Sequence, residues 1–331
     1  MSISVGCVSP SRAEEEREGV ALTNLDQPLF DGANATKRDL IDYLDAVSGR
    51  IIPVLQDRPL SVIRVHRGQE AFMQKNLPKY TPDWIESVEW WAETSKRKVS
   101  YALCNDRRTL LWFGNQRAIE YHPTLVTASR SDRVTHLVLD LDPPEGSEAF
   151  GLAVQAAHAV RQALQDAGLE GAVKTSGAKG VHVFVPVDES AEPPDVFGAT
   201  RAIAARTEQI APDLTTTAFM KEDRGGKVFV DSTRAGGATV ICAYSPRVRQ
   251  GVPVSFPLAW DELDDVSPAD FTVHNALETL GSRDPWSEHM PKPQALPAAL
   301  IEEGNNIPIP RVAAMHEGKR RRRATHKEEE A

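Results

Sequence analysis

Hydrophobic positions recur along the chain at spacings typical of helices and of strands. A spacing of three or four residues predicts an amphipathic helix over residues 36–51, whose apolar stripe is Leu40, Ile41, Leu44, Val47 and Ile51. Thr36 is a favourable N-cap for this helix, and Asp39 stands where a capping box places an acidic residue. The same spacing predicts further helices over residues 147–168 and 195–211.

Continuous apolar runs predict strands between these helices. They cover residues 60–65 and 136–142, and residues 172–187 are predicted to form two strands joined by a tight loop. Residues 226–245 are predicted to form a hairpin around a loop of small residues, and residues 68–84 a longer loop. Helices and strands follow one another in mixed order, which favours an α+β fold over a regular βαβ array.

The two ends of the chain are polar and lack this periodicity. We expect a disordered segment at residues 1–20, one folded domain over 21–300, and an extension at 301–331 that ends in a basic, disordered tail. Four consecutive arginines in this tail precede a run of glutamates. The tail therefore either adds affinity for a polyanion or partly neutralises itself.

Composition limits the class of protein. The chain has 331 residues, of which 41% are hydrophobic and 26% charged, as is ordinary for a globular protein. Its net charge of −9 argues against a protein that simply coats nucleic acid, but not against a local basic groove. No apolar run approaches membrane-spanning length, no signal peptide is present, and no CxxC pair predicts a zinc site. We therefore expect a cytoplasmic protein without a membrane partner.

Carboxylates occur where apolar runs end. Asp140 and Asp142 are two residues apart, so both side chains lie on the same face of a strand. Adjacent carboxylates repel unless positive charge lies between them, and a divalent metal would supply it. The alternative is a solvated turn, because two prolines follow at once. Asp231 also ends an apolar run, and three such carboxylates favour a site for two metals.

The segment TSGAKGVHV contains a second candidate feature. Gly177 and Gly180 would permit close approach of the backbone to a ligand. Ser176, Lys179 and backbone N–H groups are candidates for holding phosphate oxygens, although the P-loop pattern is absent. A plain hairpin with a solvated lysine is the alternative interpretation.

Basic residues surround Asp231 in the sequence, namely Lys221, Arg224, Lys227, Arg234, Arg247 and Arg249. Such runs are commonly solvated, but here they bracket a candidate metal site, where a triphosphate and a nucleic-acid backbone need positive charge. His122 and His182 are ambiguous when taken alone, because a single histidine on a strand is commonly a satisfied core residue.

Taken together, the segments HLVLDLDPPEG, TSGAKGVHV and KVFVDS, with the later ATVICAYSPRVRQGVPVSFPLAWDEL, resemble the polymerase domain of bacterial ATP-dependent DNA ligase D. That domain is a member of the archaeo-eukaryotic primase superfamily. The resemblance implies the primase fold, in which mixed and antiparallel sheets form a catalytic groove flanked by helices. It also implies a DNA-directed primase-polymerase, a nucleotidyltransferase, with two Mn²⁺ or Mg²⁺ ions. No ligase or nuclease domain is recognisable, so we expect a stand-alone enzyme of the mycobacterial type.

The resemblance implies roles for individual residues. Asp140, Asp142 and Asp231 would be the catalytic metal ligands. The nucleotide-binding residues would be His122, Ser176, Lys179, Gly180, His182, Arg234 and Arg247. The DNA-binding residues would be Gln27, Lys37, Phe72, Met73, Lys75, Lys221 and Arg224.

Two departures from the family pattern affect DNA binding. Phe72 and Met73 stand in place of an aromatic pair that packs on the template strand, so stacking is kept at Phe72 and weakened at Met73. The first of two lysines that bind a 5′-phosphate is replaced by Gln27, whereas the second is present as Lys37. This replacement predicts weaker dependence on a 5′-phosphate than in end-joining relatives.

We therefore expect template-dependent nucleotidyl transfer in DNA repair, by primer extension and short-gap filling. The expected partners are gapped or primed DNA, nucleoside triphosphates with ribonucleotides preferred, and repair proteins, in a cytoplasmic, nucleoid-associated location. One alternative is a non-catalytic nucleic-acid-binding protein on a primase scaffold, and another is an end-joining polymerase recruited to a separate ligase. A DxD glycosyltransferase or phosphatase fits the Pro-Pro and SGxKG motifs less well.

Overall fold

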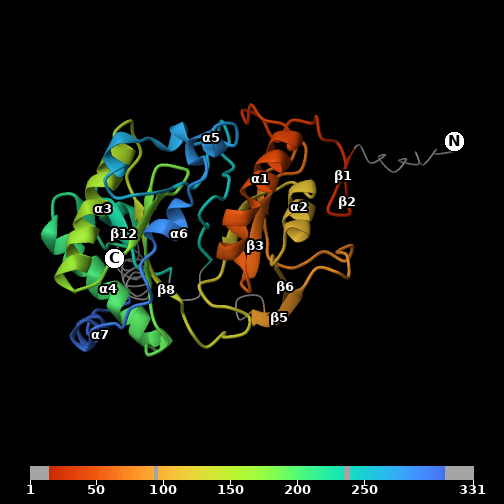
Figure 1. Ribbon diagram of the computed structural model, residues 1–331. Helices are drawn as coiled ribbons and strands as arrows, with labels where there is room; N and C mark the ends of the chain where they lie inside the picture. The colour runs from red at the N-terminus through yellow and green to blue at the C-terminus, as the bar shows by residue number, and fades with distance from the viewer. Residues whose placement is uncertain (1–14, 93–95, 235–238, 310–331) are drawn as a thin grey trace, which may run out of the picture.

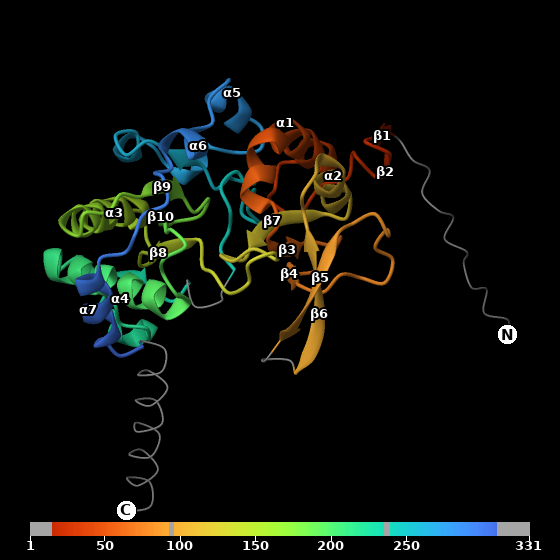
Figure 2. The ribbon, with the colours of Figure 1, turned by 60° about the horizontal axis from the view of Figure 1, so that its bottom comes forward.

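The computed structural model describes residues 15–92, 96–234 and 239–309. Two lobes lie side by side, one with α3, α4 and α7 and the other with α1 and α2 (Figure 1, Figure 2). The helices are α1 Lys37–Leu55, α2 Arg107–Asn115, α3 Ala149–Asp166, α4 Pro193–Ile210, α5 Ala276–Leu280, α6 Pro285–His289 and α7 Ala298–Asn305. Each lobe is built on its own sheet, so the α+β prediction is confirmed.

The first lobe contains a six-stranded sheet in the order β11-β12-β8-β10-β9-β13. Its strands are β8 His136–Asp142, β9 Ala172–Thr175, β10 Val181–Pro186, β11 Thr215–Thr216, β12 Val228–Asp231 and β13 Pro257–Leu258. All pairs except β11–β12 are antiparallel. Helices α3 and α4 pack against this sheet and bury the face that carries Leu139 and Leu141. The opposite face, with Asp140 and Asp142, is left for the site.

The second lobe contains a five-stranded sheet in which β4, β3, β6 and β5 follow in order and β7 also pairs with β3. Its strands are β3 Pro59–Arg64, β4 Phe72–Gln74, β5 Ser87–Ala92, β6 Arg97–Leu103 and β7 Ala118–Pro123. The predicted helix over 36–51 is α1, and Thr36 and Asp39 form the expected capping box. The predicted loop over 68–84 is wrong in part, because β4 pairs with β3 inside it.

The predicted hairpin over 226–245 is wrong. Strand β12 pairs with β8 and β11 of the first sheet. The chain after residue 238 instead reaches the second sheet, where the N–H groups of Val240 and Cys242 donate to the carbonyl groups of Pro123 and Tyr121. The apolar side chains of β12 are buried in the first sheet, beside β8. After Asp231, the last residue of β12, the chain therefore passes from the first lobe to the second.

The expected limits of the folded domain also need correction. Residues 15–17 and 20–22 form the two-stranded sheet β1–β2, so the disordered segment cannot extend to residue 20. Helix α7 crosses the expected boundary at residue 300 and packs on α4, where Gly304 and Gly198 allow close approach of the two backbones. Residues 1–14 and the predicted basic tail lie outside the described residues.

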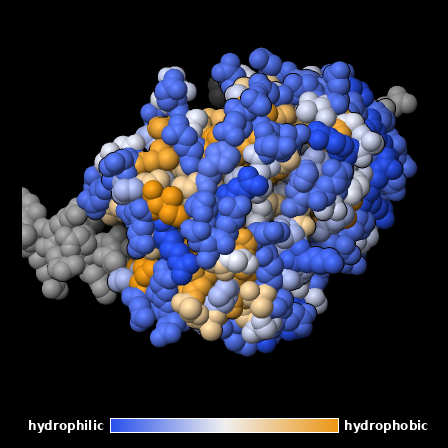
Figure 3. Space-filling model, turned by 60° about the vertical axis from the view of Figure 1, so that its left-hand side comes forward, coloured by the Kyte–Doolittle hydropathy of each residue, from blue (hydrophilic) through white to orange (hydrophobic). Residues whose placement is uncertain are grey.

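The surface over the first lobe is mainly polar. On the side that α3 and α4 occupy, hydrophilic residues predominate and hydrophobic residues form separate patches (Figure 3). Among the described residues, no helix combines the length and apolar character required to cross a lipid bilayer.

Candidate active site

The register of the six-stranded sheet aligns four polar residues in one row. Asp231 of β12 lies directly opposite Asp140 of β8, which lies opposite His182 of β10, which in turn lies opposite Lys174 of β9. Residues directly opposite in antiparallel strands project from the same face, with Cβ atoms roughly 5 Å apart. The row therefore places two carboxylates, an imidazole and an amine side by side, with Lys174 at its buried end.

Asp140 is at the centre of this row. Its Oδ1 lies 3.2 Å from His182 Nε2, and its Oδ2 lies 2.8 Å from Arg234 Nη2. Burial raises the pKa of Asp140, but the interactions with His182 and Arg234 outweigh it and hold the pKa below its usual range. Burial is also the main cause that lowers the pKa of His182, to about 4. Asp140 is therefore a carboxylate, and His182 is a neutral imidazole near pH 7.

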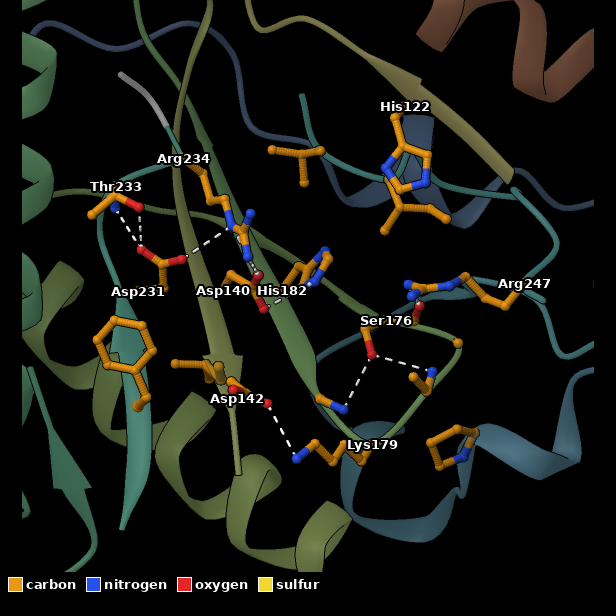
Figure 4. A pocket seen from close by; sticks show the side chains of 18 of the residues that line it. His122, Asp140, Asp142, Ser176, Lys179, His182, Asp231, Thr233, Arg234 and Arg247 are labelled. Atoms are coloured by element: carbon orange, nitrogen blue, oxygen red, sulfur yellow. Dashed lines mark hydrogen bonds and ion pairs between the residues drawn. The ribbon is translucent and has the colours of Figure 1, made fainter. Parts of the chain in front are cut away.

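Arg234 bridges the carboxylates of Asp140 on β8 and Asp231 on β12. Its Nε lies 3.0 Å from Asp140 Oδ2 and 3.1 Å from Asp231 Oδ2 (Figure 4). Asp231 Oδ1 accepts from the backbone N–H of Thr233 at 2.8 Å and from its hydroxyl at 2.6 Å. The turn after β12 thus fixes one oxygen of Asp231, while the guanidinium pairs with both carboxylates.

Asp142 is two residues further along β8 and lies on the same face. It accepts from Arg224 Nη1 at 2.9 Å and lies 3.4 Å from Lys179 Nζ. The Arg224 guanidinium also covers the ring of Phe229, 4.0 Å from its centroid. Lys179 donates in addition to Glu145 and to the carbonyl of Pro143, each at 2.8 Å. Lys179 is therefore paired with two carboxylates while its side chain stays partly exposed.

The TSGAKG loop differs from its expected use. The hydroxyl oxygen of Ser176 accepts from the N–H groups of Ala178 and Gly180, at 3.2 and 3.1 Å, so these two donors are already satisfied. A Cβ at Gly180 would clash with the Leu141 carbonyl, and one at Gly177 would lie 2.6 Å from Arg247 Cγ. The glycines permit close approach to the protein's own β8 and to Arg247, a role that the sequence did not predict.

His122 reaches the site from β7 of the second lobe. Its Nε2 lies 2.9 Å from Oε2 of the buried Glu120, whose Oε1 accepts from Arg247 Nε at 3.2 Å. Burial raises the pKa of Glu120, but His122 and Arg247 outweigh it and lower the pKa to about 2. Burial lowers the pKa of His122, so the guanidinium of Arg247 is the fixed positive charge in this group. Arg247 also donates to the Ser176 carbonyl at 2.7 Å, which connects both lobes.

Two polar residues of the site were not predicted. Glu120 orients His122 and Arg247. In the sequence, the only sign of this role is its position two residues before His122. Lys174 is fully buried, and burial lowers its pKa to about 7. Its only sequence signal is a lysine inside the apolar run that forms β9.

Most of these residues line one open cavity of about 1610 Å³, whereas Glu120 and Lys174 are outside its lining. The predicted site residues that line it are His122, Asp140, Asp142, Ser176, Lys179, Gly180, His182, Arg224, Asp231, Arg234 and Arg247. The structure thus brings all predicted catalytic and nucleotide-binding residues together. From the predicted DNA-binding set, only Arg224 is among them.

The other predicted DNA-binding residues lie outside the lining of this cavity. Phe72 and Met73 are exposed on β4, and Lys75 and Lys221 are exposed too. Lys37 is only 3% exposed, and its Nζ donates to the Thr23 carbonyl and to Asn115 Oδ1, both at 2.6 Å. Gln27 donates to Asn24 Oδ1 at 3.2 Å. Lys37 is therefore not the exposed cation that binding of a phosphate would suggest.

The three carboxylates are held by cations of the protein itself. Within the ranges that the structure describes, no three His, Cys, Asp or Glu side chains gather their ligating atoms as they would around a metal ion. Instead, Arg234 faces Asp140 and Asp231, while Arg224 and Lys179 face Asp142. The donor set nevertheless fits a hard divalent cation, because Mg²⁺ and Mn²⁺ prefer carboxylate oxygens. Arg234, Arg224 and Lys179 balance the negative charge of the carboxylates, which a bound divalent cation would also balance.

Comparison with known proteins identifies close similarities over most of the chain. The profile of the family described as "LigD, primase-polymerase domain" matches residues 36–286. The bifunctional non-homologous end joining protein LigD of Bacillus subtilis is 34% identical over 285 residues, which cover 84% of this chain and 45% of that protein. The multifunctional LigD of Mycolicibacterium smegmatis is 35% identical over 276 residues, covering 80% of this chain and 35% of that protein. The chain thus spans less than half the length of these curated relatives.

A solved structure is similar in fold as well as in sequence. It is the polymerase domain from Mycobacterium tuberculosis ligase D in complex with DNA. It superposes with a TM-score of 0.74 at 32% identity and covers 83% of this chain and 98% of that chain. The similarity therefore extends over most of this chain and nearly all of that one.

Proposed function

The chain belongs to the family of LigD primase-polymerase domains, which are DNA nucleotidyltransferases, and on this premise we propose that it extends a DNA primer by template-directed nucleotide addition. The observation that carries the proposal is the row formed by Asp231 and Asp140 across β12 and β8, with Asp142 on the same face. The row lies in a cavity with several basic side chains, as the charge of a triphosphate requires.

Domains of this family are metal-dependent, and we assign the metal site to Asp140, Asp142 and Asp231. Two divalent ions, Mn²⁺ or Mg²⁺, would stabilise the attacking and the leaving oxygen of the phosphoryl displacement. The chain's own part is to hold the carboxylates ionised. His182 donates to Asp140, and Thr233 to Asp231, so each carboxylate keeps one oxygen fixed. Arg234, Arg224 and Lys179 would turn from the carboxylates to the phosphates when the metals bind.

The nucleotide would lie between the carboxylates and the second lobe. Arg247 and His122 reach this space from the side opposite Asp140, and Glu120 holds both in place. We assign the triphosphate to Lys179, Arg234 and Arg247 because these are cationic side chains of the cavity lining. As the family resemblance implies, we further propose that ribonucleotides are preferred. A site that hydrogen-bonds the 2′-hydroxyl penalises its absence, because buried partners are left unpaired.

The primed or gapped DNA would contact both lobes, the second through β4 and the first through the segment between β11 and β12. Phe72 and Met73 are exposed neighbours on β4, with 37% and 45% of their surface accessible. An exposed aromatic ring beside Arg64, 5.9 Å from the ring centroid, is suited to stacking on a base. We propose that the template strand packs on Phe72, that Lys75 and Lys221 contact the DNA backbone, and that the protein acts in DNA repair.

The test is extension of a labelled primer on gapped and plain templates. The arms contain Mn²⁺, Mg²⁺ or a chelator, and either ribonucleotides or deoxyribonucleotides. We expect addition in both metal arms, more with Mn²⁺ than with Mg²⁺, and more with ribonucleotides. DNA binding without any addition in the metal arms would favour the non-catalytic alternative. Equal use of matched ribonucleotides and deoxyribonucleotides would refute the sugar preference alone.

A further inference from the structure

Lys174 is the last polar residue in the row of the six-stranded sheet and has no accessible surface. Its Nζ lies 3.0 Å from His182 Nδ1 and 2.6 Å from Ser255 Oγ. The ring of Phe184 lies beside the same nitrogen, 5.7 Å from its centroid. No carboxylate is within ion-pair distance of Lys174 in the described part of the chain. Burying an amine costs free energy that an apolar side chain of similar size would not cost. A lysine at this position therefore suggests a role for its hydrogen bonds.

The neighbouring groups fix the direction of every hydrogen bond. The Ser255 hydroxyl donates to the Thr175 carbonyl at 2.9 Å, so its oxygen is free to accept from Lys174. The carboxylate of Asp140 only accepts, so His182 must carry its hydrogen on Nε2. Nδ1 of the neutral ring then accepts from Lys174, which has enough hydrogens for both bonds whether it is charged or neutral.

We propose that Lys174 is a positioning residue that holds His182 as the Nε2–H tautomer and thereby directs this N–H at Asp140. Without a donor at Nδ1, the imidazole could turn or exchange its tautomer, and an unprotonated Nε2 would face the carboxylate. Because Lys174 is buried behind His182, it touches neither nucleotide nor DNA and acts only through the ring. This role rests on the proposed function to the extent that Asp140 is a metal ligand.

Hydrogen-bond partners of a metal ligand, here His182 beside Asp140, set the orientation of that ligand. Their removal commonly costs about 10- to 100-fold in metal affinity or activity. In the row Lys174–His182–Asp140, His182 would orient the metal ligand Asp140, and Lys174 would orient His182. It gives a reason for a lysine in the middle of a fully buried strand.

The experiment reads the tautomer directly. The full chain is labelled with ¹⁵N-histidine, and the two ring nitrogens of His182 are identified by comparison with His182→Asn. In the metal-free natural protein we expect Nε2 to be protonated and Nδ1 to be a hydrogen-bonded acceptor. In Lys174→Met we expect the Nδ1 resonance to move to the frequency of an acceptor without a donor. We also expect Mn²⁺, measured alone by electron paramagnetic resonance, to bind about tenfold more weakly.

Lys98→Met is the matched control, because Lys98 is an exposed lysine on β6 of the other sheet, with 73% of its side chain accessible. It should change neither the His182 resonances nor Mn²⁺ binding. A protonated Nδ1 in the natural protein, or an unchanged Nδ1 resonance or Mn²⁺ affinity in Lys174→Met, overturns the proposal. If Lys174→Met does not fold, the spectrum of the natural protein decides by itself. If the natural protein binds no Mn²⁺, the proposed function fails while the spectrum still tests the Lys174–His182 contact.

Discussion

The two sheets hold their candidate residues in different ways. On the six-stranded sheet, Asp231, Asp140 and His182 are directly opposite one another, so backbone hydrogen bonds fix their relative positions. On the second lobe, the candidates for DNA binding come from β4 and from the segments around the start of α1. They share neither a sheet row nor a cavity. Residues that strand register brings together form a site without any help from a ligand, whereas the others depend on a long substrate to connect them.

Charge differs between these regions as well. Asp140, Asp142 and Asp231 of the first lobe are each paired with Arg234, Arg224 or Lys179. On the second lobe, Lys37 is buried against neutral oxygens, and Phe72 and Met73 are open to solvent. We expect substitutions in the first region to affect chemistry strongly, and substitutions in the second to affect substrate choice by smaller factors.

The largest effect should come from the carboxylates. Asp140→Ala or Asp142→Ala removes a proposed metal ligand, and a loss of about 4 kcal/mol of transition-state stabilisation corresponds to about a thousandfold in rate. Single-turnover nucleotide addition on gapped DNA measures this loss. Asp265→Ala, at an exposed position that does not line the cavity, should retain full activity. Activity near the natural level in either site variant would show that the row is not the catalytic centre.

Glu120→Gln should have the next largest effect, because it weakens the hold on both His122 and Arg247. Loss of charged hydrogen bonds costs about 1.5–3 kcal/mol each, which predicts a roughly 10- to 100-fold increase in KM for the nucleotide. Steady-state kinetics with varied nucleotide and saturating DNA provide the measurement. Glu302→Gln on α7 is the control, since Glu302 is exposed. An unchanged KM would separate the second lobe from nucleotide binding.

Glu120 also predicts a dependence of stability on pH. Its pKa is lowered from 4.5 to about 2 in the folded chain, so the unfolded chain binds more protons between these values. The stability that Glu120 contributes is present above about pH 4.5 and is lost as the pH falls towards 2. Urea unfolding between pH 5 and 2.5 should therefore show a shallower fall in Glu120→Gln than in the natural protein. Parallel curves would contradict the ionised, paired state of Glu120.

The smallest effect should be at Gln27. A lysine there would exchange a neutral contact with a phosphate for a charged one, a gain of about 1 kcal/mol or about fivefold in affinity. We expect Gln27→Lys to increase the preference for gapped DNA that carries a downstream 5′-phosphate. Binding to DNA with and without this phosphate measures it, and Gln165→Lys on the exposed side of α3 controls for added charge. If the natural protein already discriminates tenfold, or Gln27→Lys changes nothing, an end-joining role regains support.

The contrast between the lobes also explains what the sequence can predict. Alternation places Asp140 and Asp142 on one face of a strand, and α1 follows from its stripe and its capping box. The sequence around β12 does not indicate that this strand pairs with β8 instead of forming a hairpin, because the pairing depends on apolar strands that are distant in sequence. The roles of Lys174 and Glu120 depend on that pairing and on contact between lobes. The burial of Lys37 likewise depends on Thr23 and Asn115, which are distant from it in sequence.

A count of Mn²⁺ ions bound to the natural chain tests the proposed metal site most directly. Electron paramagnetic resonance with a non-hydrolysable nucleoside triphosphate and gapped DNA measures free and bound Mn²⁺ without any catalysis. We predict two bound ions per chain in the natural protein and fewer in Asp140→Asn, because the metals would replace Arg234, Arg224 and Lys179 at the carboxylates. Absence of bound Mn²⁺, or equal binding in Asp140→Asn, would contradict the assignment of the row as a metal site.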